Sequence, residues 1–185
     1  AGITLGTGIG GGMVINGHLV SGTSGAAAEV GHMKVEHGGK LCGCGQYGCW
    51  EAYASATGLQ REAISRLAVN KDSILWERIG HDPQKIEAKH IFDAAKEGDK
   101  FALSLLDYEI KYLSMGIANI LNLLNPELVV IGGGISLAGD ILFDRLKEKL
   151  KEETLKVALD VVKIVPAKLG NDAGVVGAAA LLMKL

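Results

Sequence analysis

The chain has 185 residues, 48% of them hydrophobic, with 26 glycines, 3 prolines and a formal net charge of -2 at pH 7. This length suffices for one domain with a substantial core, and the small residues suit a domain that packs helices against a sheet. The slightly acidic balance argues against nucleic acid as a general partner. No apolar run approaches the roughly 18 residues that cross a bilayer, so no membrane span is expected.

The N-terminal residues predict antiparallel strands. Residues 2–5 have the pattern of a strand that enters the glycine-rich segment 6–12. Apolar triplets on both sides of Asn16-Gly17 predict a hairpin, because both turn residues tolerate positive φ. We therefore expect a meander of three strands. Because the chain opens on a strand at Ala1 without an initiator methionine, we also expect it to be the C-terminal part of a longer protein.

The middle of the chain is predicted to be mainly helical. Helical periodicity runs over about 59–68, and residues 71–90 suggest short helices or a surface excursion. A long helix is predicted from an N-cap at Asp99 to Leu124, since its apolar residues recur at spacings of four and three. An Asn-Pro pair then ends the helix.

The C-terminal part alternates strands with helices. A continuous apolar run at 128–131 is typical of a strand buried on both faces. A helix over 140–151, a strand over 161–165 and a last helix capped near Asp172 complete the order βββ, insertion, αβαβα. This is the order of the ribonuclease-H-like α/β fold, which is duplicated in the actin, hexokinase and Hsp70 superfamily. The chain would be one of the two copies, with a zinc loop and a helical insertion.

Every cysteine of the chain lies close to a histidine, in the set His32, Cys42, Cys44 and Cys49. Three cysteines cannot all pair as disulfides, and one imidazole with three thiolates makes a closed tetrahedral set for Zn²⁺. Four protein ligands leave no open position, so a structural zinc is expected. On spacing alone, His37 remains a second candidate for the histidine ligand. Unpaired thiols favour a reducing cytoplasm as the location.

Two glycine clusters suggest a nucleotide site. Residues 6–12 lie between predicted strands, where backbone N–H groups can approach phosphate oxygens, and no Gly-Lys-Ser/Thr follows, so this is not a Walker loop. Residues 132–134 follow a buried strand, where ligands bind in α/β sheets. Each cluster alone is equally compatible with a tight turn. Two of them in one domain favour a nucleotide between them.

Glu29 and Glu51 flank the cysteine cluster on its two sides. Carboxylates accept hydrogen bonds from vicinal sugar hydroxyls, and each bond to a charged acceptor is worth about 1.5–3 kcal/mol. An isolated glutamate is more often a solvated surface residue, but a metal that orders the segment would also orient both acids. We therefore interpret the pair as candidate sugar ligands.

Together these motifs resemble the ROK family of repressors, open reading frames and sugar kinases, and they look most like those of bacterial-type glucokinases. The residues that carry the resemblance are LGTGIGGG at 5–12, EVGH at 29–32, CGCGQYGCWE at 42–51, LNPE at 124–127 with GGG at 132–134, and LGNDAG at 169–174. The resemblance covers essentially the whole chain. It implies that residues 1–185 are the C-terminal domain of a two-domain kinase whose N-terminal domain is absent.

The resemblance implies a role for each motif. The residues implied to bind ATP are Gly6, Thr7, Gly8 and Gly10 at the phosphates and Gly133 and Gly134 beside the adenosine. The residues implied to bind the sugar are Glu29, His32 and Glu51. Zinc would be held by His32, Cys42, Cys44 and Cys49. Metal coordination through one nitrogen of His32 would fix the tautomer with which the other nitrogen meets the sugar. Mg²⁺ would accompany ATP.

The resemblance also implies an incomplete catalytic site. The family's catalytic Asp and its Asp-x-Gly-x-Thr phosphate loop belong to the N-terminal domain, and Asp172 does not fit the motif of the base. No catalytic residue is therefore expected in this chain. We expect it to be the C-terminal part of an ATP-dependent hexose kinase that phosphorylates a primary hydroxyl. It should be inactive alone, because phosphoryl transfer depends on both walls of the cleft.

Two other functions are compatible with parts of the sequence. The sugar-sensing domain of a ROK transcriptional repressor would carry the same sugar and zinc motifs, but a pure sensor does not need the glycine set for ATP. A zinc-ribbon module that binds nucleic acid or protein is disfavoured by the acidic balance and by the absence of basic residues within the cysteine cluster. Family resemblance alone suggests a homodimer, and the hexose itself is left open.

Overall fold

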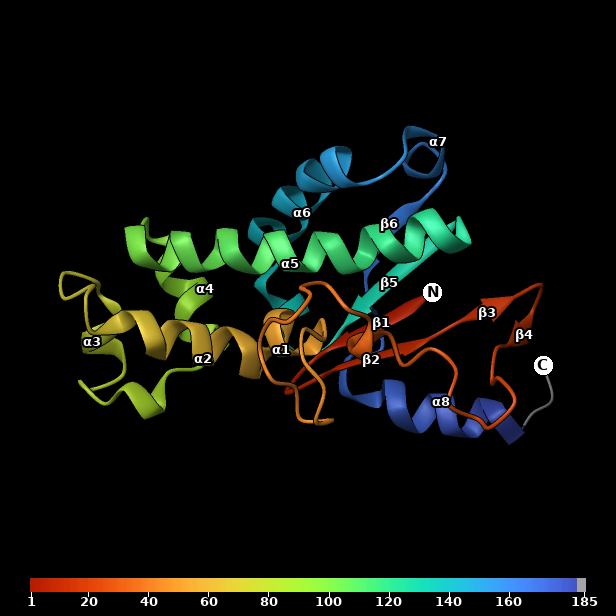
Figure 1. The fold of residues 1–185 in the computed structure, drawn as a ribbon, viewed down its shortest axis with the longest axis horizontal. Helices are drawn as coiled ribbons and strands as arrows, with labels where there is room; N and C mark the ends of the chain where they lie inside the picture. The colour runs from red at the N-terminus through yellow and green to blue at the C-terminus, as the bar shows by residue number, and fades with distance from the viewer. Residues whose placement is uncertain (183–185) are drawn as a thin grey trace.

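The computed structural model describes residues 1–182 (Figure 1). The strands are β1 (Gly2–Leu5), β2 (Ile9–Gly12), β3 (Val14–Ile15), β4 (His18–Leu19), β5 (Leu128–Gly132) and β6 (Lys163–Pro166). The α-helices are α1 (Glu51–Ala54), α2 (Ala56–Leu67), α3 (Leu75–Arg78), α4 (Ala88–Lys96), α5 (Lys100–Leu124), α6 (Asp140–Glu153), α7 (Lys156–Leu159) and α8 (Ala173–Leu182). Short 3-10 helices are η1 (Val30–His32), η2 (Pro83–Lys85), η3 (Gly134–Ala138) and η4 (Gly170–Asp172).

Four strands form the central sheet in the order β2-β1-β5-β6. β1 pairs antiparallel with β2 and parallel with β5, and β5 pairs parallel with β6. Parallel neighbours need a helical crossover, which α6 and α7 supply between β5 and β6. Ile3, Leu5, Val129 and Ile131 are buried at alternate positions along β1 and β5. The topology confirms the predicted ribonuclease-H-like α/β fold.

The long helix α5 connects the sheet to a lobe of helices. In Figure 1 α5 crosses the molecule from α4 to the start of β5, with α2 and α4 below it and α6 above it. The Asp99 side chain accepts a hydrogen bond from the N–H of Ala102, as the predicted N-cap should. At the other end Asn125 adopts a left-handed φ of 44° and stops the helix. Leu113 and Ile117 belong to its fully buried face.

The predicted meander differs from the observed strands. The second strand of the main sheet is β2, which uses residues of the glycine-rich segment because buried Ile9 gives that segment a place in the core. The hairpin at Asn16-Gly17 does form, with φ values of 52° and 78°. Its strands β3 and β4 make a separate two-stranded sheet. Val14 and Ile15 are exposed there, so the hairpin has no buried face to align with β1.

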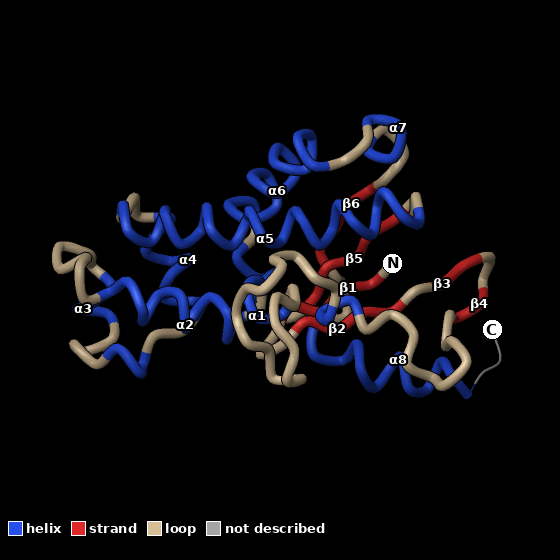
Figure 2. The backbone as a smooth tube through the Cα atoms, viewed as in Figure 1, coloured by secondary structure: helices blue, strands red, loops and turns tan. Residues whose placement is uncertain are grey.

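Helices α2, α3 and α4 form the lobe at the left of Figure 2. α2 and the short α3 and η2 match the predicted helix and the predicted mixed segment. The sequence analysis did not predict α4. Its periodicity was nevertheless present, since Ile91, Phe92 and Ala95 recur at helical spacing and are buried.

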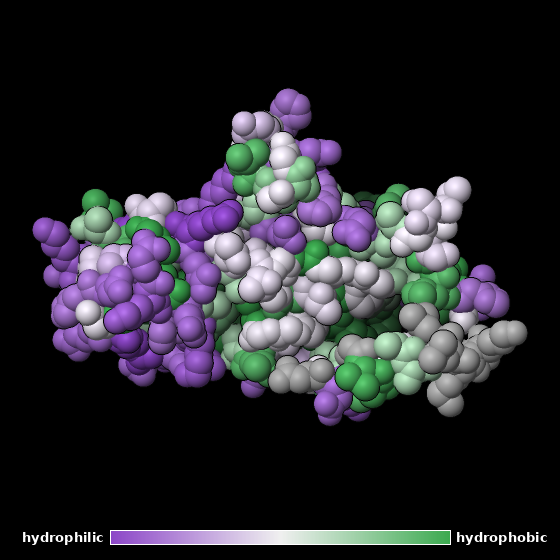
Figure 3. Space-filling model, turned by 90° about the horizontal axis from the view of Figure 1, so that it is seen from below, coloured by the Kyte–Doolittle hydropathy of each residue, from purple (hydrophilic) through white to green (hydrophobic). Residues whose placement is uncertain are grey.

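The surface is unevenly apolar. Seen from below, its left end is hydrophilic, whereas apolar colour gathers over the middle and right (Figure 3). Exposed large apolar side chains include Val14, Ile15 and Leu19 on the hairpin and Val175 and Val176 on α8. Within residues 1–182, no helix is both long and apolar enough to cross a membrane.

Candidate functional site

Four potential metal ligands converge in the segment before α1, which we call the metal loop (residues 32–49). The ligand atoms of His32, Cys42, Cys44 and Cys49 all lie within 4.8 Å of one another. The Sγ atoms of Cys44 and Cys49 are 3.7 Å apart, and Cys42 Sγ lies 3.8 Å from His32 Nδ1. His37, the second candidate, is outside this group. The structure thus brings together the set that the resemblance implied.

The spacing of these atoms fits zinc. Sulfurs bound to Zn²⁺ at about 2.3 Å lie roughly 3.8 Å apart on a tetrahedron, close to the 3.7 Å between Cys44 and Cys49. Burial raises the pKa of the Cys42 thiol to about 11, whereas a hydrogen bond from the Gln46 backbone lowers the pKa of exposed Cys44. A cation with high affinity for thiolates would offset the raised pKa of Cys42, because a bound metal favours the ionised form of its thiol ligand.

Lys34 contacts the metal-ligand group from outside. Its Nζ lies 3.0 Å from Cys49 Sγ, and the backbones of the two residues form an isolated antiparallel bridge. Three thiolates around a divalent ion would carry a net charge of about -1, which this ammonium is placed to offset. No sequence signal indicates Lys34, because only the folded loop brings it to Cys49.

Trp50 anchors the end of the metal loop in the core. The indole is fully buried, and its Nε1 donates a hydrogen bond to the carbonyl of Tyr112 at 2.8 Å. Gly116 on α5 leaves room for the ring, since a Cβ there would lie 2.0 Å from it. This anchor sets the direction in which the chain enters α1, and thereby the direction of Glu51.

The two carboxylates that are candidates for binding sugar, Glu51 and Glu29, differ in how the protein orients them. Glu51 Oε2 accepts a hydrogen bond from the N–H of Ile9 at 2.9 Å, and its Oε1 lies 3.8 Å from Cys42 Sγ. Glu29 has an exposed side chain, with Oε2 4.0 Å from His32 Nε2. His32 therefore faces a cysteine with Nδ1 and Glu29 with Nε2, so one ring can serve a metal and a ligand on opposite sides.

Residues 6–8, which join β1 to β2, form a turn that we call the glycine turn. A hollow of about 390 Å³ lies between this turn and the end of β5. Its lining residues are Thr4, Gly6, Thr7, Gly8, Ile9, Gly10, Glu51 and Gly133. The N–H of Gly6 donates to the carbonyl of Gly8 at 3.0 Å and closes the turn. Gly133 has a φ of 89°, and a Cβ there would lie 2.3 Å from the Leu5 carbonyl, so only glycine fits. The hollow joins five of the six predicted ATP residues.

The sixth, Gly134, lines a neighbouring apolar pocket of about 440 Å³. The walls of this pocket come from the start of α2, from the length of α4 and from η3, with Ala56, Ala88, Phe92, Ile135, Leu137 and Ala138 among the lining residues. Because Gly133 and Gly134 are consecutive, the polar hollow and the apolar pocket meet at the end of β5. The sequence analysis missed the pocket because it missed α4, which helical periodicity would have revealed.

Comparison with known proteins gives consistent matches. The family model described as the ROK family matches residues 1–184. A glucokinase of Thermotoga maritima is 43% identical over 97% of this chain, and a xylose repressor of Caldicellulosiruptor bescii is 30% identical over 98% of it. A solved ROK family glucokinase from Streptomyces griseus, in complex with glucose and AMPPNP, superimposes with a TM-score of 0.88 at 37% identity over 97% of the chain.

These proteins are all longer than the chain. It covers 56% of the Thermotoga glucokinase, 45% of the xylose repressor and 59% of the Streptomyces structure. The chain therefore spans about half the length of the relatives that it matches.

Proposed function

This chain belongs to the ROK family, and from that premise we propose that it is the C-terminal domain of an ATP-dependent hexose kinase of the glucokinase type. The observation that carries the proposal is the juxtaposition of three sites: a metal-ligand group, two carboxylates beside it, and a glycine-lined hollow that shares Glu51 with them. A sugar-sensing domain needs the first two, whereas a kinase needs all three.

ATP is proposed to lie along the polar hollow and the apolar pocket. Gly6, Thr7, Gly8 and Gly10 would meet the phosphates, because backbone N–H groups without flanking side chains suit close approach to anions. Gly133 and Gly134 would lie beside the adenosine, and the apolar walls of the pocket suit its base. Mg²⁺ would accompany ATP and neutralise charge on its phosphates.

The hexose is proposed to bind Glu29, His32 and Glu51. The carboxylates would accept hydrogen bonds from ring hydroxyls, and His32 would offer Nε2 while Nδ1 holds the metal. Glu51 belongs to the proposed sugar site and also accepts a hydrogen bond from Ile9, next to the glycine turn. This position suits a reaction between the hexose and ATP. In that reaction the primary hydroxyl would attack the γ-phosphorus of ATP and give its proton to a base outside this chain, while the bond from that phosphorus to the β,γ-bridging oxygen breaks and ADP leaves.

The metal is proposed to be a structural Zn²⁺ held by His32, Cys42, Cys44 and Cys49. Four protein ligands fill its coordination, so it would order the metal loop and orient His32. A cytoplasmic location is proposed with it, since free thiols persist in reducing compartments.

The partners are proposed to be the N-terminal domain of the same protein and, in the assembled enzyme, a second subunit. The exposed apolar side chains of the hairpin and α8 support a contact with further protein. The catalytic base would come from the N-terminal domain. The isolated chain is therefore expected to lack kinase activity.

A repressor is the second candidate, because the xylose repressor of Caldicellulosiruptor bescii matches 98% of this chain at 30% identity. A repressor would bind sugar without nucleotide. Binding of AMPPNP to the purified chain, followed by calorimetry, therefore separates the two candidates.

The decisive test is glucose phosphorylation by the protein that carries both domains. ATP-dependent product is expected, with a loss of at least 100-fold in kcat/KM for Glu51→Gln. The 185-residue chain, purified free of host kinases, is expected to give no product above a no-protein control. Sugar binding without AMPPNP binding or phosphorylation would reject the kinase in favour of the repressor.

A further inference from the structure

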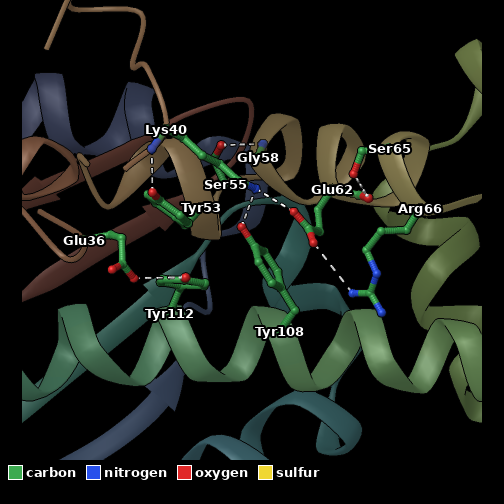
Figure 4. A network of polar contacts seen from close by, with 10 residues as sticks. All are labelled: Glu36, Lys40, Tyr53, Ser55, Gly58, Glu62, Ser65, Arg66, Tyr108 and Tyr112. Atoms are coloured by element: carbon green, nitrogen blue, oxygen red, sulfur yellow. Dashed lines mark hydrogen bonds and ion pairs between the residues drawn. The ribbon is translucent and has the colours of Figure 1, made fainter. Parts of the chain in front are cut away.

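Lys40, in the middle of the metal loop, reaches out of the loop to helices α1, α2 and α5 (Figure 4). Its Nζ donates hydrogen bonds to Glu62 Oε2 on α2 at 2.7 Å and to the Tyr108 hydroxyl on α5 at 2.6 Å. Its backbone N–H donates to the Tyr53 hydroxyl on α1 at 2.6 Å. One loop residue therefore contacts three helices, none of which contains a metal ligand.

The surroundings of Lys40 favour a firm contact. Its Nζ lies 4.8 Å from the centre of the Tyr108 ring and 5.1 Å from that of Tyr53, both suitable for cation–π attraction. Glu62 is mostly buried and also pairs with Arg66 at 3.7 Å. Burial raises the pKa of Tyr108, so its hydroxyl stays neutral and available as an acceptor. The Lys40 side chain is 37% exposed and that of Glu62 is 17% exposed, so this ion pair is partly shielded from solvent and is worth more than one on an open surface.

Helix α2, which Lys40 contacts, also contacts the glycine turn. The N–H of Ala56, the first residue of α2, donates to the carbonyl of Gly6 at 2.8 Å. The Ser55 side chain caps the same helix end by accepting from the N–H of Gly58. Lys40, bound to Glu62 in the middle of α2, and Gly6, bound to its first residue, thus attach the metal loop and the glycine turn to one helix.

We propose that Lys40 is a positioning residue that fixes the metal loop to α2 independently of the metal ion. It thereby holds the proposed sugar-binding residues at a constant distance from the glycine turn proposed to bind the phosphates of ATP. The second half of this inference rests on the proposed kinase function, whereas the first half does not. Zinc and Lys40 are then two separate anchors of the loop, one at the cysteines and one at the helices.

Hydrogen–deuterium exchange of the loop tests the independent anchor. After chelation and confirmed removal of zinc, peptides covering residues 36–41 of the unmodified chain should stay protected. In zinc-stripped Lys40→Met the same peptides should exchange at least tenfold faster. Equal exchange in the two stripped proteins would overturn the proposal, because Lys40 would then add nothing to the order of the loop in the absence of the metal.

Three further variants sharpen this test. Lys40→Arg keeps the charge and should restore most of the protection, whereas Glu62→Gln should lose part of it. Lys71→Met, at an exposed position, is the matched control and should behave as the unmodified chain. Peptides from buried α5 report global unfolding. If Lys40→Met also speeds exchange in the α5 peptides, that variant has lost its global fold and Glu62→Gln replaces it as the test. Unchanged protection of residues 36–41 in zinc-stripped Glu62→Gln then rejects the proposal.

Ligand affinity tests the positioning role in the two-domain protein. The KM for glucose should rise about tenfold in Lys40→Met while the KM for ATP changes less than twofold, and Lys40→Arg should restore it. Equal changes for both substrates would reject the positioning role. If the unmodified protein uses neither substrate, the proposed function fails while the exchange result still stands.

Discussion

The carboxylate of Glu51 accepts a hydrogen bond from the backbone N–H of Ile9 at 2.9 Å. This bond joins the first turn of α1, set by the metal loop, to the glycine turn between β1 and β2. One side chain thereby belongs to both the proposed sugar site and the hollow proposed for phosphates. Displacing it should disturb the sugar site without unfolding the domain.

Gly8→Ala is the mildest change that moves Glu51. A Cβ at Gly8 would lie 2.2 Å from Glu51 Oε2, so the flexible carboxylate must leave its place. We expect glucose affinity to fall at least tenfold, with a loss of unfolding free energy of only about 1 kcal/mol. Calorimetric titration and urea melts measure the two effects. Gly12→Ala, where a Cβ meets nothing within 4 Å, is the matched control, and equal effects of both variants would contradict this account.

Removal of the metal should destabilise the protein. Free zinc at a thousandfold excess over its Kd contributes about 4 kcal/mol to the folded state, which corresponds to about 10 °C in Tm for a chain of this size. Differential scanning calorimetry before and after chelation measures the shift, and re-addition of zinc should reverse it. Cys44→Ser should show the low Tm with or without zinc. An unchanged melt after confirmed metal loss would count against a structural zinc.

Lys34→Met should weaken zinc binding by about 10- to 100-fold, the usual effect of losing an outer-shell partner. The reason is the 3.0 Å contact between its Nζ and Cys49 Sγ, which offsets the negative charge of the thiolate site. Competition with a chromophoric chelator measures the affinity. Lys34→Arg retains the charge and should stay within a few-fold of the unmodified chain; equally weak binding by both variants would point to packing in place of charge.

Glu109, buried on α5, should make stability depend on pH. Neither carboxyl oxygen has a hydrogen-bond partner among the described residues, and burial raises its pKa from 4.5 to about 8. The folded state therefore keeps a proton that the unfolded chain releases. This contribution to stability is complete below pH 4.5 and is lost as pH rises through 8.

Glu109→Gln cannot ionise and isolates this effect. Relative to the variant, the unmodified chain should lose unfolding free energy between pH 5 and 8, by at most about 5 kcal/mol at 1.4 kcal/mol per pKa unit. Urea melts at pH 5, 7 and 9 measure the difference. Glu152→Gln, on the exposed side of α6, is the control and should show no such trend. Parallel curves for the unmodified chain and Glu109→Gln would refute the buried neutral acid.

Local chemistry determined the elements that the sequence predicted well. Three features depend only on residues adjacent along the chain, and the sequence therefore predicted them. They are the cap at Asp99, the Asn16-Gly17 turn and the apolar run of β5. A metal site of the three cysteines with a nearby histidine was likewise predictable, since metal ligands have strong preferences for residue type and spacing.

Only the tertiary structure decided which distant residues meet. Lys34 reaches Cys49, Lys40 reaches Glu62, and Glu51 reaches Ile9 because α1, α2 and β1 pack around a common core. The choice of His32 over His37 also depended on how the loop closes, which spacing alone left open. Residue types and short spacings thus determine which chemistry this chain can perform. Long-range packing decides which groups share a site, because contacts between distant segments leave no periodic trace in the sequence.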